Sequence, residues 1–203
     1  MDTQYKILFS DIGGVLLSNG WGHESRIAAA QKFGINYEEM DVLHDFIFNV
    51  YEMGKISLDD YLDTVVFNHE RSFSKQEFKD FMFASSILLP QTLSWLIDWK
   101  KSHANIKVIS LNNEARELNG YRIKKFHLHD FFDAFISSCD VGMRKPDPGI
   151  YNLALGIAQA QPEECLYFDD RIMLVEAAKK AGIHAYHHQG FENTKKIIES
   201  LVG

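Results

Sequence analysis

Polar side chains that suit phosphoryl chemistry stand at four places in the chain, each beside an apolar run or in a loop rich in proline and charge. A carboxylate that attacks phosphorus needs a divalent cation to offset charge repulsion, a hydroxyl to hold the phosphate oxygens, and a positive side chain to neutralise developing charge. Mg²⁺ in turn prefers a few carboxylate oxygens. The residues of these types are Asp11, Ser110, Lys145 and the pair Asp169-Asp170.

Each candidate also has a purely structural explanation. Asp11 precedes Gly13 and Gly14, so it could simply form a turn. Asp169 or Asp170 could cap a following helix, and Lys145 could be a solvated loop residue. The order of all of them along one chain favours the chemical interpretation over these alternatives.

Apolar runs and helical periodicity predict the elements that would position these side chains. Strands are expected at residues 7–10, 106–110, 134–137, 165–168 and 183–187, with amphipathic helices between them. Strands that alternate with helices indicate a doubly wound α/β fold, that is, a mostly parallel, Rossmann-like sheet with helices on both faces. Ligands bind such sheets beyond the carboxyl ends of the strands, where Asp11 and Asp169-Asp170 are predicted to lie.

The segment between the first two strands has a different pattern. Residues 23–34 and 37–51 have helical character, and further helices are predicted to start at Ser57 and at Ser74, the latter with Ile87 on its inner side. We therefore predict an α/β core domain formed by residues 1–16 and 89–203, and an inserted all-helical cap domain formed by residues 17–88. Hinges are expected at residues 16–22 and 88–90.

Composition limits the possible partners and the location. The 203 residues are 46% hydrophobic and 24% charged, with a formal net charge of −7, which argues against nucleic-acid and membrane partners. No apolar stretch is long enough for a membrane span, and the first residues are polar, so a cytoplasmic protein is expected, as a monomer or homodimer. Cys139 and Cys165 adjoin apolar runs and are expected to be buried thiols.

Taken together, these motifs resemble those of the haloacid dehalogenase superfamily, in particular the subgroup with a helical cap after the first strand. The resemblance covers essentially the whole chain. The matching stretches are Asp11-Ile12-Gly13-Gly14-Val15-Leu16, Val108-Ile109-Ser110, Val141-Gly142-Met143-Arg144-Lys145-Pro146-Asp147-Pro148-Gly149-Ile150-Tyr151, and Leu166-Tyr167-Phe168-Asp169-Asp170-Arg171 with Val175-Glu176-Ala177-Ala178 after it.

The resemblance implies a role for each candidate. Asp11 would be the nucleophile that becomes an aspartyl-phosphate, and Lys145 would pair with Asp11 and the phosphate. Ser110 would bind the phosphoryl oxygens, with Leu111 and Asn112 beside it in the substrate-binding stretch. Mg²⁺ would be held by Asp11, the backbone carbonyl of Gly13 and Asp170, with Asp169 as alternative or helper. The expected substrate is a small phosphorylated metabolite, and sugar phosphates are one class of such substrates that the resemblance suggests.

The departures from the family pattern leave three functions open. Gly13 stands where most phosphatases of the family carry an acid that protonates the leaving group, although members similar to this one, including sugar-phosphate phosphatases, have glycine there. Leu111 and Leu174 stand where asparagines are common. A Mg²⁺-dependent phosphatase is our main hypothesis, beside a catalytically weak or silent phosphate-binding protein and a hydrolase that attacks carbon. The dehalogenase branch has Tyr at the position of Gly13, which disfavours the last.

Overall fold

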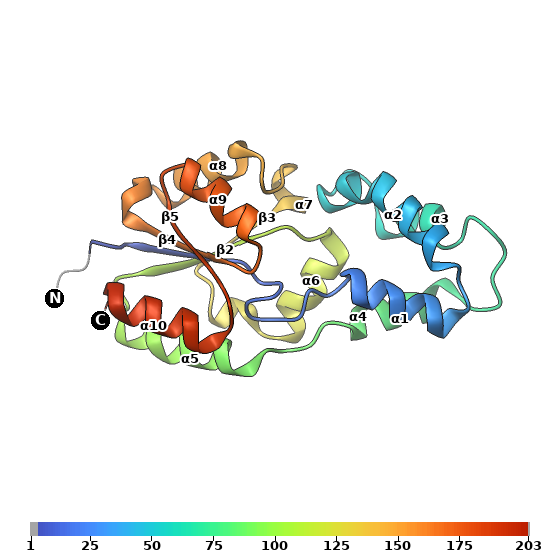
Figure 1. Cartoon of the computed structure of the whole chain (residues 1–203), viewed down its shortest axis with the longest axis horizontal. Coiled ribbons are helices and arrows are strands. Elements are labelled where there is room, and N and C mark those ends of the chain that lie inside the picture. The colour runs from blue at the N-terminus through green and yellow to red at the C-terminus, as the bar shows by residue number, and fades with distance from the viewer. Residues whose placement is uncertain (1–3, 203) are drawn as a thin grey trace.

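A five-stranded, all-parallel sheet forms the centre of the molecule in the computed structural model, which describes residues 4–202 (Figure 1). The strand order is β3-β2-β1-β4-β5, and every neighbouring pair is parallel. This confirms the predicted α/β class. The strands are β1 (Ile7–Ser10), β2 (Lys107–Asn112), β3 (Ala134–Ser137), β4 (Cys165–Asp169) and β5 (His184–His187).

Alternation along the strands directs side chains into two separate hydrophobic layers. Leu8 packs on the face covered by α5 (Pro90–Ser102) and α10 (Phe191–Val202). Its neighbours Ile7 and Phe9 pack on the opposite face, under α8 (Pro148–Ala158) and α9 (Ile172–Lys180). Figure 1 shows these two helix pairs above and below the sheet, as the doubly wound prediction requires.

Four helices form a second body beside the sheet, which we call the helical unit (Figure 1). It has its own hydrophobic core, to which Leu118 also contributes from α6 (Arg116–Lys125), the helix that follows β2. The helices of the unit are α1 (His23–Phe33), α2 (Tyr37–Glu52), α3 (Leu58–Val65) and α4 (Lys75–Ala84).

Local capping explains where these helices begin and end. Ser57 and Ser74 each form a capping box with the acidic residue three positions later, which confirms the helix starts predicted there. Gly34 ends α1 in the left-handed conformation, with φ of 65°. The prediction for Ile87 was wrong: α4 ends at Ala84, and Ile87 is 62% exposed.

The two segments that connect the helical unit to the sheet run side by side. Leu17 and Leu88 form an isolated antiparallel bridge, in a segment predicted to be wholly helical. The backbone N–H of Ser18 donates to the carbonyl of Ile87 at 2.8 Å, and this pairing draws Ile87 away from α4. The predicted hinges are thus joined to each other. The division into domains at residues 16 and 89 stays a prediction, and residues 1–3 and 203 of the predicted core lie outside the described residues.

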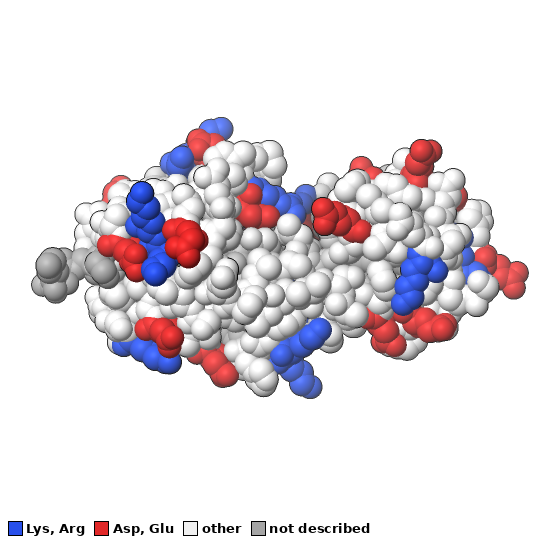
Figure 2. Space-filling model, turned by 60° about the horizontal axis from the view of Figure 1, so that its bottom comes forward, with Lys and Arg blue, Asp and Glu red and all other residues white. Residues whose placement is uncertain are grey.

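Three short elements complete the fold: α7 (Ser138–Val141) and the 3₁₀ turns η1 (Leu128–Asp130) and η2 (Pro162–Glu164). Cys139 and Cys165 are free and buried, as expected. Acidic and basic side chains are interspersed on the face shown in Figure 2. Within residues 4–202, no helix combines the length and apolar character needed to cross a membrane.

Candidate active site

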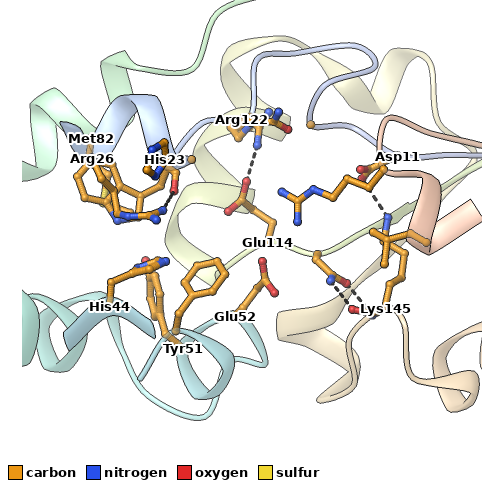
Figure 3. Close-up of a pocket in the computed structure, with 18 of the residues that line it drawn as sticks. Asp11, His23, Arg26, His44, Tyr51, Glu52, Met82, Glu114, Arg122 and Lys145 are labelled. Carbon is orange, nitrogen blue, oxygen red and sulfur yellow. Dashed lines mark hydrogen bonds and ion pairs between the residues drawn. The ribbon is translucent and has the colours of Figure 1, made fainter. Parts of the chain in front are cut away.

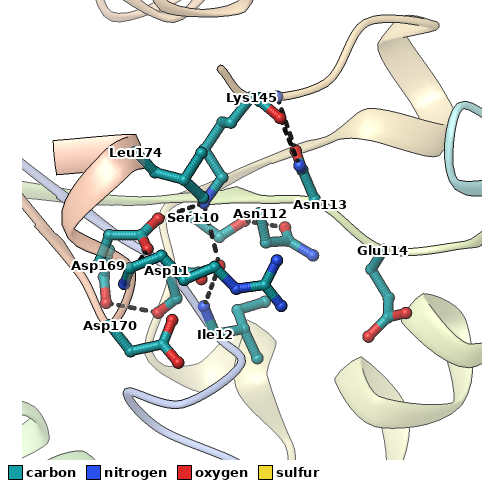
Figure 4. A network of polar contacts seen from close by, with 12 residues as sticks. Asp11, Ile12, Ser110, Asn112, Asn113, Glu114, Lys145, Asp169, Asp170 and Leu174 are labelled. Atoms are coloured by element: carbon teal, nitrogen blue, oxygen red, sulfur yellow. Dashed lines mark hydrogen bonds and ion pairs between the residues drawn. The ribbon is translucent and has the colours of Figure 1, made fainter. Parts of the chain in front are cut away.

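The strand register brings the predicted site residues to one edge of the sheet. Ser10 lies opposite Ser110 on one side and opposite Phe168 on the other. The backbone N–H of Asp11 donates to the carbonyl of Phe168 at 2.9 Å, so Asp11 leaves β1 where Asp169 ends β4. Figure 4 shows Asp11, Asp169 and Asp170 facing one another at this edge.

Lys145 reaches this edge from the loop before α8 and is 1% exposed. Its Nζ lies 3.3 Å from Oδ1 of Asp11 and 2.7 Å from Oδ2 of Asp169 (Figure 4). Burial opposes its charge, but these two carboxylates raise the pKa of Lys145 above its ordinary value. The structure therefore brings Lys145 and Asp11 together as an ion pair.

Asn113 fixes the backbone on which Lys145 stands. Its Oδ1 accepts from the N–H of Lys145 at 2.9 Å, and its Nδ2 donates to the carbonyl of the same residue at 2.9 Å. This role of Asn113 was not predicted. Its nearness to Ser110 in the chain was the only available signal, because Lys145 lies 32 positions away.

The carboxyl group of Asp11 is shifted strongly toward its protonated form. Burial raises the pKa of Asp11 to about 7; Lys145 opposes this shift, whereas Asp169 and Asp170 add to it. Oδ1 accepts from the N–H of Ile12 at 2.8 Å, which holds the carboxyl group at one oxygen. A cation that binds beside this group would favour its charged, nucleophilic form.

Asp169 is committed to holding other residues of the site. Its Oδ2 accepts from Lys145 and from the buried hydroxyl of Tyr167, and its Oδ1 accepts from the N–H of Arg171 at 2.8 Å. Burial opposes its ionisation, but Lys145 and these donors keep the pKa of Asp169 below its ordinary value. Tyr167 was not predicted as part of the site, although strand alternation places residues 167 and 169 on one face.

Asp170 presents the carboxylate oxygen that is best suited to a metal ion. Its Oδ1 is buried and has no hydrogen-bond partner among the described residues, while Oδ2 accepts from Nδ2 of Asn19 at 3.3 Å. One oxygen from each of Asp11, Asp169 and Asp170 lies within 4.8 Å of the others. Because hard cations bind such clustered carboxylates, the residues present fit Mg²⁺, with Asp169 in the helper role.

Two adjacent glycines shape the loop after Asp11 in different ways. Gly14 has φ of +70°, and a Cβ there would lie 2.1 Å from Oδ2 of Asp170, so this position requires glycine. Gly13 has no positive φ, and a Cβ there would lie 3.1 Å from Oδ1 of Asn19. The backbone therefore does not impose glycine at position 13, where the family resemblance would place an acid.

The predicted substrate-binding stretch lies at the end of β2, with two of its side chains turned inward. Leu111 packs its side chain into the core under α8 and α9, and the amide of Asn112 is bonded to Ser137 and Asn119. These two side chains are held inside the protein, and the part of Leu111 and Asn112 in substrate binding stays a prediction. Ser110 lies at the expected strand level with its hydroxyl buried 3.5 Å from Oδ1 of Asn112, and its role stays a prediction.

A cavity of about 320 Å³ extends from this edge of the sheet into the helical unit. Figure 3 shows Asp11 and Lys145 at one end and His44 at the other, with Glu52 and Glu114 between them. The cavity is thus enclosed by elements that are distant in the chain. For this reason most of its lining residues were not predicted from local sequence patterns.

Two ion pairs lie in or behind this wall. Glu114 pairs with Arg122, and Glu52 pairs with Arg144 at 2.5 Å. Burial raises the pKa of both glutamates, with the arginines opposing the shift. Arg171 also lines the cavity, and its positive charge adds to the lowering of the pKa of both glutamates. Neither Glu52 nor Glu114 was predicted to belong to the site.

The family model of the haloacid dehalogenase-like hydrolases matches residues 5–182. The chain belongs to this family. The match includes strands β1 to β4 and every predicted site residue, which agrees with the resemblance drawn from the motifs. The members of this family are hydrolases by name.

Several curated relatives match only segments of this haloacid dehalogenase-like hydrolase. A phosphorylated carbohydrates phosphatase from Thermotoga maritima is 40% identical over 62 residues, which are 30% of this chain and 29% of the relative. This relative and four others are matched over only 7% to 29% of their own lengths, so the activities of those whole proteins cannot be assigned directly to this chain.

Solved structures of other haloacid dehalogenase family enzymes share the fold over nearly the whole chain. A family enzyme from Bacteroides thetaiotaomicron superimposes with a TM-score of 0.82, is 24% identical, and covers 96% of this chain and 98% of its own; it is also described in complex with magnesium and inorganic phosphate. An L-2-haloacid dehalogenase from Xanthobacter autotrophicus gives a TM-score of 0.64 at 17% identity, covering 98% and 84%. Likenesses at these identities show the fold alone.

Proposed function

We propose that the chain is a Mg²⁺-dependent hydrolase of small phosphomonoesters that works through an aspartyl-phosphate on Asp11. The observation that carries the proposal is the position of Lys145, which is buried between Asp11 and Asp169. Oδ1 of Asp170, which belongs to the same cluster of carboxylates, has no hydrogen-bond partner among the described residues. The carbohydrate phosphatase named above supports sugar phosphates as the substrate class.

The arrangement assigns a task to each side chain. Ile12 and Lys145 hold Oδ1 of Asp11, so the other oxygen is available to attack phosphorus. As the Asp11–phosphorus bond forms and the bond to the leaving oxygen breaks, the ammonium of Lys145 offsets the developing negative charge. Water then attacks phosphorus and releases Asp11.

The metal site would be built from Asp11, Asp170 and the carbonyl of Gly13. Mg²⁺ bound there supplies positive charge that lowers the repulsion between the carboxylate and the phosphate. Asp169 holds Lys145 and the loop of Arg171 in place rather than serving as the first choice of ligand.

Because residue 13 is glycine, it cannot protonate the oxygen of the leaving group. A positioned general acid is worth about a hundred- to ten-thousand-fold in rate, and glycine supplies none. Leaving groups that depart as stable anions depend least on such a proton. Aryl phosphates should therefore be hydrolysed faster than alkyl or sugar phosphates when all are saturating.

The test is phosphate release from sugar, nucleotide and aryl phosphates, with and without Mg²⁺, beside Asp11→Asn. We expect release only with Mg²⁺ and none by the variant. Binding of substrate without turnover would instead identify a silent phosphate-binding protein. Dehalogenation that continues after Mg²⁺ is chelated would identify a hydrolase that attacks carbon.

A further inference from the structure

The far end of the cavity, inside the helical unit, contains a buried chain of hydrogen bonds. Nε1 of Trp21 donates to the hydroxyl of Tyr61 at 2.8 Å, and that hydroxyl lies 2.7 Å from Nδ1 of His44. Trp21 and His44 both line the cavity, whereas Tyr61 is fully buried behind them. The chain runs from the segment before α1 through α3 to α2.

The donors and acceptors fix the direction of this chain. An indole N–H can only donate, so the oxygen of Tyr61 accepts from Trp21. The remaining proton of Tyr61 has one acceptor among the described residues, which is Nδ1 of His44. Leaving that buried hydroxyl proton without an acceptor would be costly, so Nδ1 accepts and the ring proton of His44 is on Nε2.

His44 stays neutral in this environment. The charged groups that face it are Arg26 on α1 and Asp41 on α2, which pair with each other at 2.8 Å. Burial, assisted by Arg26 and opposed by Asp41, lowers the pKa of His44 to about 3. The imidazole is therefore a fixed donor of one hydrogen bond rather than a cation.

The Nε2 atom is free to meet a ligand. It has no hydrogen-bond partner within residues 4–202, and His44 lines the cavity although only 3% of the residue is exposed. The ring of Phe48 lies 4.3 Å from that of His44 and restricts its rotation. Met82 and Trp21 add apolar surface beside it.

We propose that this end of the cavity is a subsite for the leaving group, in which Nε2 of His44 donates a hydrogen bond to an uncharged oxygen, a hydroxyl or a carbonyl. This inference rests on the proposed function and deepens it. His44 is a specificity-determining residue and Tyr61 a positioning residue. The subsite favours a polyhydroxylated or carbonyl-bearing leaving group, because the N–H of His44 needs an acceptor.

Kinetics with two substrates test the contact. We compare a hexose phosphate, which carries distal hydroxyls, with phenyl phosphate, which carries none, and take the ratio of their kcat/KM values. His44→Leu should lower this ratio about five- to a hundredfold, because an oxygen of the bound sugar loses its donor. His44→Gln, which keeps an N–H donor, should restore part of it.

A matched control lies on the same helix. Phe46 is 80% exposed and does not line the cavity, so Phe46→Ser should leave the ratio at the wild-type value. A ratio unchanged in His44→Leu, or lowered equally in the control, would overturn the proposal.

A second measurement does not depend on turnover. Long-range ¹H–¹⁵N NMR of the ring should show the proton of His44 on Nε2 at pH 7, and Tyr61→Phe should release this preference while leaving the other histidines unchanged. Titration with the hexose phosphate should shift the Nε2 signal of the wild type. If the protein hydrolyses nothing, the proposed function fails, and this titration alone decides the subsite: an unshifted signal, or a proton on Nδ1, refutes it.

Discussion

Position 13 is where the site differs most from a complete phosphatase. The backbone at Gly13 accepts a side chain, and the nearest atom to a Cβ there is Oδ1 of Asn19 at 3.1 Å. We expect Gly13→Asp to raise kcat for alkyl phosphates by about tenfold or more, because it supplies the missing acid once Asn19 yields slightly. Steady-state kinetics measure this change. A variant that gains nothing on alkyl phosphates while still binding Mg²⁺ would show that another group already protonates the leaving oxygen.

The neighbouring glycine allows a test of the metal site. Gly14→Ala places a methyl group 2.1 Å from Oδ2 of Asp170 and must displace that carboxylate. We expect Mg²⁺ affinity, measured by calorimetry, to fall by about tenfold or more, the scale seen when groups supporting a metal site are removed. Gly34→Ala is the matched control: its φ is also positive, at +65°, but no atom lies within 4 Å of its added Cβ. Equal losses in both variants would mean that backbone strain, not Asp170, is responsible.

At the scale of elements, the contact between α2 and α3 should make stability depend on pH. His44 on α2 has its pKa lowered from 6.5 to about 3 in the folded protein. Below pH 6.5 the unfolded chain binds a proton that the folded chain does not, so His44 stabilises the fold above that pH and the contribution is lost as pH falls. The free energy of unfolding should fall by up to about 1.4 kcal/mol per pH unit from this group.

Urea unfolding at pH 6 and pH 4.5 checks this expectation. His44→Gln should flatten the dependence between these two values, whatever its effect on absolute stability. The same slope in the variant and the wild type would contradict the burial of a neutral imidazole between α2 and α3.

For the whole molecule, the sheet and the order of the site residues were predictable, because each depends on a local pattern. Apolar runs marked all five strands, and parallel strands necessarily bring Asp11 and Asp170 to one edge. Asn113, Glu114 and His44 could not be assigned in this way. Their roles depend on contacts with residues far away in the chain, such as the pairing of Asn113 with the Lys145 backbone.

The segments that join the two bodies show the same limit. Leu17 and Leu88 are 71 positions apart, and the local sequence around either residue does not predict that they pair. That pairing also ended α4 earlier than its periodicity indicated. The cavity that the two bodies enclose, and with it the expected selection of substrate, follows from these long-range contacts.

Trapping of the phosphorylated protein tests the central claim most directly. The protein is mixed with Mg²⁺ and a phosphomonoester that it hydrolyses, quenched in acid and digested, and the peptides are analysed by mass spectrometry. We predict one phosphoryl group on Asp11 in the wild type, and none after Asp11→Asn or after chelation of Mg²⁺. Phosphate release without phosphorylation of Asp11, or release that survives Asp11→Asn, would contradict the account.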